Sequence, residues 1–365
     1  MAAHYRSLRD LDWAMIVLAV AISGLGMLQI YSATLDGRWN DAWWKQGVWL
    51  FAGIILMWVA AKIDYHTLLA QVPLMYAVSI GLLIATLLVA PFIWGSRRWI
   101  PLFAGFRFQS SEFVKLVIIL LVARYLTEIK KDKLDLGDLV RLGLLVALPM
   151  GLVMIQPDLG TSLTYLPALA VGVFLGGLTW RHAAAIGLLV ALTIPAGYFF
   201  LLKDYQRGRL ETFLDPDRDP RGKGYQVIQS KIAVGAGGVW GKGVTHGSQT
   251  QLRFLPVTHT DFIIAAFAEE HGFVGIVVLL SLYFLLLMQI IQNAQTAPDR
   301  AGMYICMGVA AVLLFHLIVN AGMATGRIPV TGIPLPLMSY GGSSMMSVFL
   351  MLGLVNNVRL RRFVS

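Results

Sequence analysis

The chain has 365 residues, of which 57% are hydrophobic and 13% charged, and its mean hydropathy is +0.70. A soluble domain usually carries about 25% charged residues, so an ordinary soluble enzyme is excluded because there is too little polar surface to cover one. The net charge of +9 is not gathered on a basic face with interleaved aromatic residues, so we expect no nucleic-acid partner.

Ten apolar runs are each long enough to cross a bilayer, whose core of about 30 Å needs roughly 20 helical residues. We therefore expect an all-α polytopic membrane protein with one domain over residues 1–365. Pro157 and Gly160 divide the fifth run from the sixth, since proline and glycine together end helices. The predicted spans are 12–33, 43–62, 70–92, 110–127, 138–155, 160–178, 182–202, 262–292, 301–325 and 341–358.

The basic residues indicate how the chain is oriented, because cytoplasmic loops of membrane proteins are rich in lysine and arginine. With ten spans both termini lie on one side, and the basic residues there place both in the cytoplasm. The long connection 203–261 then lies outside, where a loop of this length is usually functional or disordered. The basic residues on the cytoplasmic side are Arg6, Arg9, Arg124, Lys130, Lys131, Lys133, Arg141, Arg359, Arg361 and Arg362.

Arg97, Arg98 and Arg107 fall on the outer side, against this rule, and are the first functional indication. Glu112 and Lys115 follow at the mouth of the fourth span, on one helix face at i, i+3 spacing. They are either a structural ion pair or, with the nearby arginines and Gln109, a site for an anionic lipid headgroup.

Asp158 directly precedes the segment with Gly160, Thr161 and Ser162. It either caps the helix that follows or points into a cavity, where it would bind a cation or orient a sugar. Between the last two spans lies a segment rich in proline and glycine that cannot be a regular helix. Irregular backbone at membrane depth is tolerated only when it is buried in protein or lines a cavity. Its serines, Ser339, Ser343 and Ser344, cap the last span or line a substrate groove.

Asp261 lies where the eighth span begins, beside His259 and the long connection. It is either a helix N-cap or a functional carboxylate that accepts a proton or ligates a metal, and both latter roles suit glycosyl transfer. Glu269 and Glu270 lie two turns further along the same helix, and we expect one of them to face a polar interior.

Taken together, these motifs resemble those of the SEDS family of peptidoglycan glycosyltransferases, the RodA and FtsW proteins, in family order over nearly the whole chain. The segment Pro329 to Pro336 is more similar to RodA than to FtsW, which favours elongation over division. Val257 departs from the acidic residue that many members carry there. The matching blocks are Arg97-Arg98-Trp99-Ile100, Phe108-Gln109-Ser110-Ser111-Glu112, Gln156-Pro157-Asp158-Leu159-Gly160-Thr161-Ser162, Gly224-Tyr225-Gln226, Gln229-Ser230, Gly241-Lys242-Gly243, Phe254-Leu255-Pro256, His259-Thr260-Asp261-Phe262, Pro334-Leu335-Pro336 and Ser339-Tyr340-Gly341-Gly342-Ser343-Ser344.

The resemblance implies a ten-span fold in the bacterial cytoplasmic membrane that polymerises lipid II into a nascent glycan strand at the outer face. It also implies a divalent cation, Mg²⁺ or Mn²⁺, a class B penicillin-binding protein as partner, and membrane proteins of the elongation complex. Asp261 matches the family's essential aspartate, and Glu112 with Lys115 matches its charged pair. The predicted substrate-binding residues are Arg97, Arg98, Gln109, Glu112, Lys115, Asp158, His259, Ser343 and Ser344.

Two other functions use the same residues. A flippase for the lipid-linked precursor needs an inward-facing polar cavity, and a scaffold for a penicillin-binding protein needs no reactive carboxylate at all. The glycosyltransferase hypothesis alone requires Asp261 for polymer formation but not for folding.

Overall fold

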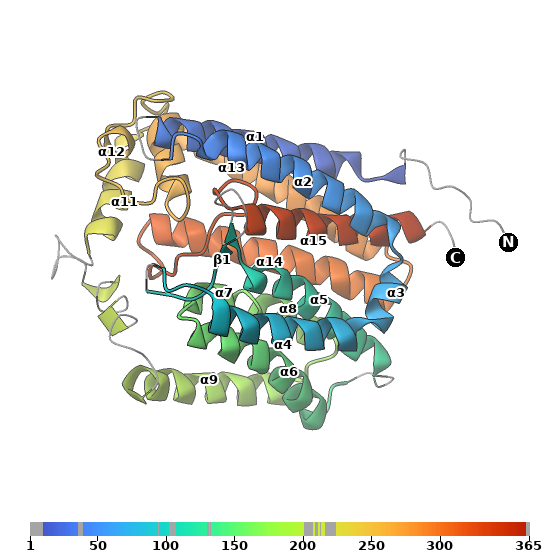
Figure 1. Ribbon diagram of the computed structural model, residues 1–365. Coiled ribbons are helices and arrows are strands. Elements are labelled where there is room, and N and C mark those ends of the chain that lie inside the picture. The colour runs from blue at the N-terminus through green and yellow to red at the C-terminus, as the bar shows by residue number, and fades with distance from the viewer. Residues whose placement is uncertain are drawn as a thin grey trace.

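The computed structural model describes residues 10–35, 39–93, 95–101, 107–129, 131, 133–200, 207–208, 211, 213–215 and 224–362. These residues form a helical bundle, and the described chain begins and ends at the same end of it (Figure 1). Two small helices, 225–236 and 248–251, lie at the opposite end (Figure 1). The helices are α1 (Trp13–Thr34), α2 (Ala42–Lys62), α3 (Tyr65–Ala70), α4 (Val72–Val89), α5 (Ser110–Glu128), α6 (Leu136–Ile155), α7 (Leu159–Leu163), α8 (Leu166–Leu175), α9 (Trp180–Phe200), α11 (Tyr225–Ala236), α12 (Ser248–Gln251), α13 (Ile263–Gln295), α14 (Arg300–Ala324) and α15 (Gly342–Arg361).

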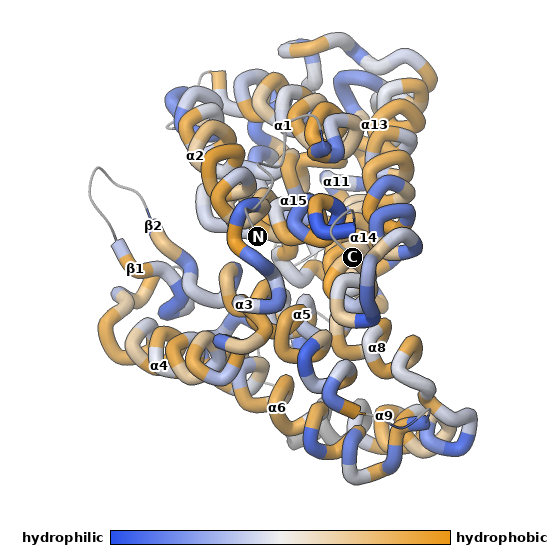
Figure 2. Tube along the Cα trace, turned by 90° about the vertical axis from the view of Figure 1, so that its right-hand side faces the viewer, coloured by the Kyte–Doolittle hydropathy of each residue, from blue (hydrophilic) through white to orange (hydrophobic). Residues whose placement is uncertain are grey.

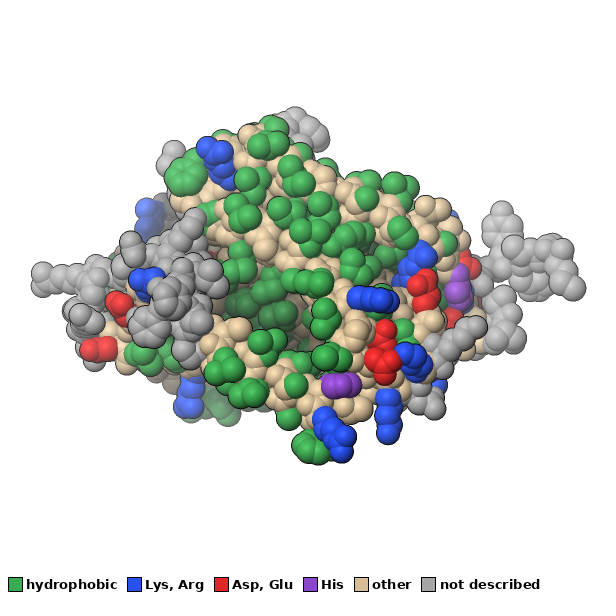
Figure 3. Space-filling model, turned by 90° about the horizontal axis from the view of Figure 1, so that it is seen from below, with side chains coloured by type: hydrophobic (Ala, Val, Ile, Leu, Met, Phe, Trp, Pro, Cys, Tyr) green, Lys and Arg blue, Asp and Glu red, His purple; other side chains and the backbone are tan. Residues whose placement is uncertain are grey.

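Seven of the described helices are long and apolar enough to span a membrane, namely α1, α2, α4, α6, α13, α14 and α15. The other three predicted spans correspond to α5, to α7 with α8, and to α9. A broad apolar band between two charged ends covers the face formed by α6 and α9 (Figure 3). The predicted fold class, an all-helical polytopic membrane protein, is thus confirmed.

Three details differ from the expected elements. The run 160–178 is broken after Leu163, and α8 begins with Pro167 in its first turn, where the missing N–H costs no helical hydrogen bond. The long connection includes the helices α11 and α12, so it is not simply a loop. Two short antiparallel strands, β1 (Ile100–Pro101) and β2 (Arg107–Phe108), precede α5.

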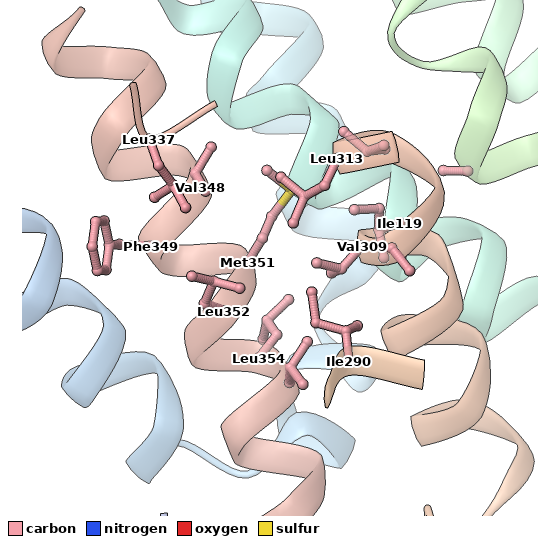
Figure 4. Packing of buried hydrophobic residues seen from close by; sticks show 14 of the residues in the cluster. Ile119, Ile290, Val309, Leu313, Leu337, Val348, Phe349, Met351, Leu352 and Leu354 are labelled. Atoms are coloured by element: carbon pink, nitrogen blue, oxygen red, sulfur yellow. The ribbon is translucent and has the colours of Figure 1, made fainter. Parts of the chain in front are cut away.

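The core forms around α15, which packs most closely against α2. Small residues allow this approach, because a side chain at Gly353 would meet the backbone of Met57, and one at Gly53 would meet the Phe349 ring. Phe349 points from α15 toward α2, whereas Met351 points toward α5 and α14 (Figure 4). Seen from the end where the chain begins, α15 lies inside the bundle, and apolar residues colour much of the outer helices (Figure 2).

A kink in α13 shapes the end that carries the long connection. Gly272 has φ 64° and ψ −164°, in the region open to glycine, and a side chain there would lie 2.3 Å from the Gly241 nitrogen. Residues 238–243 satisfy the backbone groups that the kink releases. Lys242 N–H donates to the Glu269 carbonyl at 3.0 Å, and Phe273 N–H donates to the Gly238 carbonyl at 2.9 Å.

Candidate functional site

Asp158 lies at the centre of a polar cluster between the two short strands, α5 and α7. Its carboxylate caps α7 by accepting from Thr161 N–H at 3.3 Å, which confirms the capping interpretation. Gln109 Nε2 donates to the same carboxylate at 2.9 Å, and Arg98 forms an ion pair with it at 3.1 Å. Asp158 is only 2% exposed, so its charge is neutralised mainly by Arg98. Arg97, in contrast, is exposed and forms no ion pair within the described part of the chain.

The start of α15 is joined to this cluster. Gln109 N–H donates to Ser343 Oγ at 3.0 Å, which connects the beginning of α5 to the first turn of α15. Ser344 is half-buried, and its carbonyl accepts from Ser347 Oγ at 3.0 Å. Neither serine side chain caps α15, whose N-cap residue is Gly341. Ser343 therefore ties two segments together, whereas Ser344 makes its contact through its backbone within α15.

Glu112 and Lys115 form an ion pair at 2.8 Å and are 3% and 1% exposed. Ser347 Oγ shares its one proton between the Ser344 carbonyl and Glu112, which lies 3.4 Å away. Lys115 Nζ lies 3.3 Å from His316 Nε2. The His316 Nδ1 lies 3.0 Å from the Pro334 carbonyl, which can only accept, so Nδ1 carries the proton and Nε2 accepts from Lys115. The predicted pair is thus formed, and it lies inside the bundle between α5, α14 and α15.

Asp261 lies just before α13, but it is not the helix cap. Phe262 is the N-cap residue and its own side chain makes no capping hydrogen bond, so Asp261 does not occupy the N-cap position that the sequence offered as an alternative. The Asp261 carbonyl accepts from Asn320 Nδ2 at 2.9 Å. A Cβ at Gly332, whose φ is +73°, would lie 3.4 Å from Asp261 Oδ2, so the half-buried carboxylate faces the irregular segment between α14 and α15.

His259 packs between two aromatic rings near Asp261. Its ring centroid lies 5.6 Å from that of Trp39 and 6.1 Å from that of Tyr340. Burial in this aromatic setting lowers the pKa of His259 to about 4, so the imidazole is neutral at pH 7. It therefore offers hydrogen bonds and shape to a ligand, and no positive charge.

Hydrogen bonds fix the segment between α14 and α15 against the loop that carries Asp261. Ser339 Oγ donates to the Thr260 carbonyl at 2.6 Å and accepts from Leu335 N–H at 2.9 Å. The Tyr340 N–H donates to the His259 carbonyl at 2.9 Å. This segment is consequently an ordered wall, as expected for irregular backbone buried in protein, and Ser339 is occupied in holding it.

Comparison with known proteins identifies the chain. A family model for cell cycle proteins of the FtsW, RodA and SpoVE type matches residues 12–362. This chain belongs to that family, known as SEDS.

Individual SEDS proteins resemble the chain over almost its whole length. Peptidoglycan glycosyltransferase MrdB of Escherichia coli K12 is 40% identical over 355 residues, which are 96% of this chain and 94% of MrdB. Peptidoglycan glycosyltransferase RodA of Treponema pallidum is 32% identical over 431 residues, covering 98% and 99%. A chain in a solved structure on the coordination of polymerization and crosslinking by a peptidoglycan synthase complex is 36% identical, with a TM-score of 0.84 and coverage of 97% and 99%.

Predicted residues of this SEDS chain lie along one polar path, and three side chains on it, His316, Asn320 and Ser347, were missed by the sequence analysis. Asn320 and His316 lie one turn apart on α14 and link Asp261 to Lys115. Ser347 and Ser343, one turn apart on α15, continue from Glu112 to Gln109 and Asp158. The sequence did contain a signal for His316 and Asn320, since they lie four residues apart in an apolar helix. Polar residues inside membrane spans are costly, so such a pair indicates a function.

Glu269 and Glu270 both lie inside the protein, so the expectation that only one faces a polar interior is wrong. Glu269 is 0% exposed and pairs with Lys242 at 3.0 Å, while accepting from the backbone of Gln249 and Thr250 at the start of α12. Glu270 accepts from Ser32 and Gln29 of α1. Glu269 therefore holds the long connection against α13, and Glu270 holds α1 against the same helix.

Proposed function

We propose that this protein polymerises lipid II into glycan strands at the outer face of the cytoplasmic membrane during cell elongation. As predicted, it is a peptidoglycan glycosyltransferase of the SEDS family, similar to RodA. The placement of Asp261 carries the proposal for the site, because its half-buried carboxylate faces an ordered wall and adjoins a polar path that contains every other buried predicted site residue. The direct test is formation of glycan chains by the purified protein from lipid II with a divalent metal.

The reaction needs a base for the attacking sugar hydroxyl and positive charge near the departing pyrophosphate. Asp261 is assigned as the base, since a carboxylate at this position accepts the hydroxyl proton as the bond to the anomeric carbon forms. His259 is neutral and lies in the same loop, so it orients sugar hydroxyls. The ion pair of Glu112 and Lys115 holds α5 against α14 and α15 beneath the site.

The predicted divalent cation would be held near Asp261. Asn320 Nδ2 donates to two carbonyls, those of Asp261 and Ile333, and this fixes the amide orientation. The buried Asn320 Oδ1 has no hydrogen-bond partner in the described residues, which also hold no cluster of three acidic, histidine or cysteine side chains. An amide oxygen completed by water and substrate phosphates suits Mg²⁺ or Mn²⁺, which would neutralise charge on the pyrophosphate while the Asp261 carboxylate keeps its role as base.

The partner assignment rests on the solved synthase complex, in which polymerization is coordinated with crosslinking. Crosslinking is transpeptidase chemistry, so we assign a class B penicillin-binding protein as the partner, within an elongation complex of membrane proteins. The protein itself is a multi-pass membrane protein.

Its orientation follows from the basic residues. Asp10 and Arg359 are joined by a hydrogen bond of 3.2 Å, so the described chain begins and ends on one side of the bundle, which we assign to the cytoplasm. A cysteine introduced at the exposed Glu211 should react with an impermeant reagent in intact cells. Cells expressing the parental protein, in which Cys306 is buried, are the control. Labelling only after permeabilisation would contradict the assignment.

The adjacent Arg97 and Arg98 should behave differently when each is replaced by alanine. Arg98→Ala leaves the Asp158 carboxylate without its cation, so we expect a loss of roughly 1–3 kcal/mol in the free energy of unfolding. Arg97→Ala removes an exposed cation, so we expect a raised KM for lipid II without a change in Tm. Thermal unfolding and polymerisation kinetics of both variants test this. A parental Tm in Arg98→Ala would show that the Asp158 pair has no structural role.

A further inference from the structure

A groove of about 410 Å³ lies on the bundle surface between α4, α5 and α6, separate from the polar path. It lies near the end of the bundle where the described chain begins, because Tyr76 and Arg141 are in the second turn of their helices and Tyr125 is in the last turn of α5. The three helices adjoin at this end (Figure 2). The lining residues are Tyr76, Tyr125, Arg141, Leu144, Leu145 and Leu148.

One backbone carbonyl in the floor of the groove is released by a proline and paired by a tyrosine. Pro149 lies inside α6 and has no N–H, so the Leu145 carbonyl lacks its usual helical partner. Tyr76 Oη donates to this carbonyl at 2.7 Å across the groove, which satisfies both groups. With these polar atoms paired, the exposed Leu144 and Leu148 give the groove an apolar lining. Such a surface suits a hydrocarbon chain better than a sugar, which needs hydrogen-bonding groups for its hydroxyls.

Among the described residues that line the groove, the one cation is Arg141. Arg141 is exposed and forms no ion pair within the described ranges, whereas Lys131 nearby pairs with Asp135. Asp138, one turn before Arg141, accepts from the Asp135 N–H in a capping box and does not pair with Arg141. An arginine at the end of a membrane helix extends its guanidinium to the headgroup level, where it attracts anionic lipid.

We propose that this groove binds one anionic phospholipid from the leaflet on this side. Its phosphodiester meets the Arg141 guanidinium, and one acyl chain lies over Leu144, Leu145 and Leu148. The charge at the mouth and the apolar floor are complementary to the two parts of a single lipid molecule. The ligand would contact α5 at the end opposite to Glu112 and Lys115.

The test uses the full-length protein in detergent, titrated with phosphatidylglycerol or phosphatidylethanolamine and followed by native mass spectrometry. The parental protein should retain one phosphatidylglycerol in preference to phosphatidylethanolamine. Arg141→Gln should lower that preference about fivefold, the contribution of one arginine near an anionic headgroup. Leu144→Trp fills the groove with an apolar side chain and should reduce retention of both lipids.

Two matched variants control for charge and bulk. Arg300→Gln removes another exposed arginine at the same end of the bundle but outside this groove, and Leu88→Trp enlarges an exposed leucine near the far end of α4. Both should retain phosphatidylglycerol as the parental protein does, and all four variants should keep the parental Tm within a few degrees.

Three outcomes would overturn the proposal. The first is an unchanged lipid preference in Arg141→Gln, or an equal loss in Arg300→Gln, which would indicate a general charge effect. The second is parental retention of both lipids by Leu144→Trp, which would leave the groove without a role. The third is displacement of the lipid by an equal concentration of glycerol 3-phosphate, which would indicate a site for a free phosphate ester.

Discussion

Asp261→Asn is expected to lower kcat for glycan polymerisation by about 10²- to 10⁴-fold, the usual contribution of a general base. The Kd for lipid II should change little, because a base acts in the transition state more than in ground-state binding. Asparagine keeps the size of the side chain and leaves the backbone carbonyl that accepts from Asn320 unchanged, so the Tm should stay at the parental value. Steady-state polymerisation assays with saturating lipid II and Mg²⁺, together with binding measurements, test both parts.

Asp215→Asn is the matched control, since it makes the same change at an exposed position in the same long connection. Polymerisation by Asp261→Asn at the parental rate would refute the assignment. The two alternative functions are decided by the same variant. A flippase would continue to move the precursor in a variant that cannot polymerise it, and a scaffold would tolerate Asp261→Ala entirely.

Glu112→Ala or Lys115→Ala is expected to lower the free energy of unfolding by about 3–5 kcal/mol, because each leaves an uncompensated buried charge. The double variant Glu112→Leu with Lys115→Met should recover most of this loss, since replacing both charges with apolar groups of similar volume is often neutral. Thermal unfolding in one detergent compares the three variants with the parental protein.

The activity of the double variant shows whether the ion pair has a structural role or acts on the substrate. If the pair only holds α5 in place, a folded double variant should polymerise lipid II well, with His316 and Ser347 left to pair elsewhere. If the charges act on the substrate, turnover should be lost although the Tm is restored. Single variants with the parental Tm would contradict the buried pair itself.

The predicted spans agree with the structure to within a few residues because a membrane helix is defined by local properties, namely length and apolar composition. The break near Pro167 and the helix α11 were missed for the opposite reason. A proline can begin a helix as well as end one, and α11 is stabilised by packing against α13 and α14, which no local pattern reveals.

The site was predicted in part. Glu112 with Lys115 and the capping role of Asp158 follow from spacing along one segment, so the sequence sufficed for them. His316 and Asn320 were missed because their importance lies in contacts with residues about 200 and 60 positions away. Asp261 would be the N-cap of α13 if the helix began one residue earlier. Helix boundaries inferred from a sequence are uncertain by about two to four residues, so the sequence could not decide between a cap and a site.

The kink at Gly272 has a consequence for the order in which the molecule is built. Its released backbone groups are satisfied by residues 238–243, which are synthesised before α13. Since nascent chains fold from the N-terminal end, this segment is present as a template when the first turns of α13 emerge. The kink in α13 can therefore complete its backbone hydrogen bonds with residues that are already synthesised, without waiting for α14 or α15.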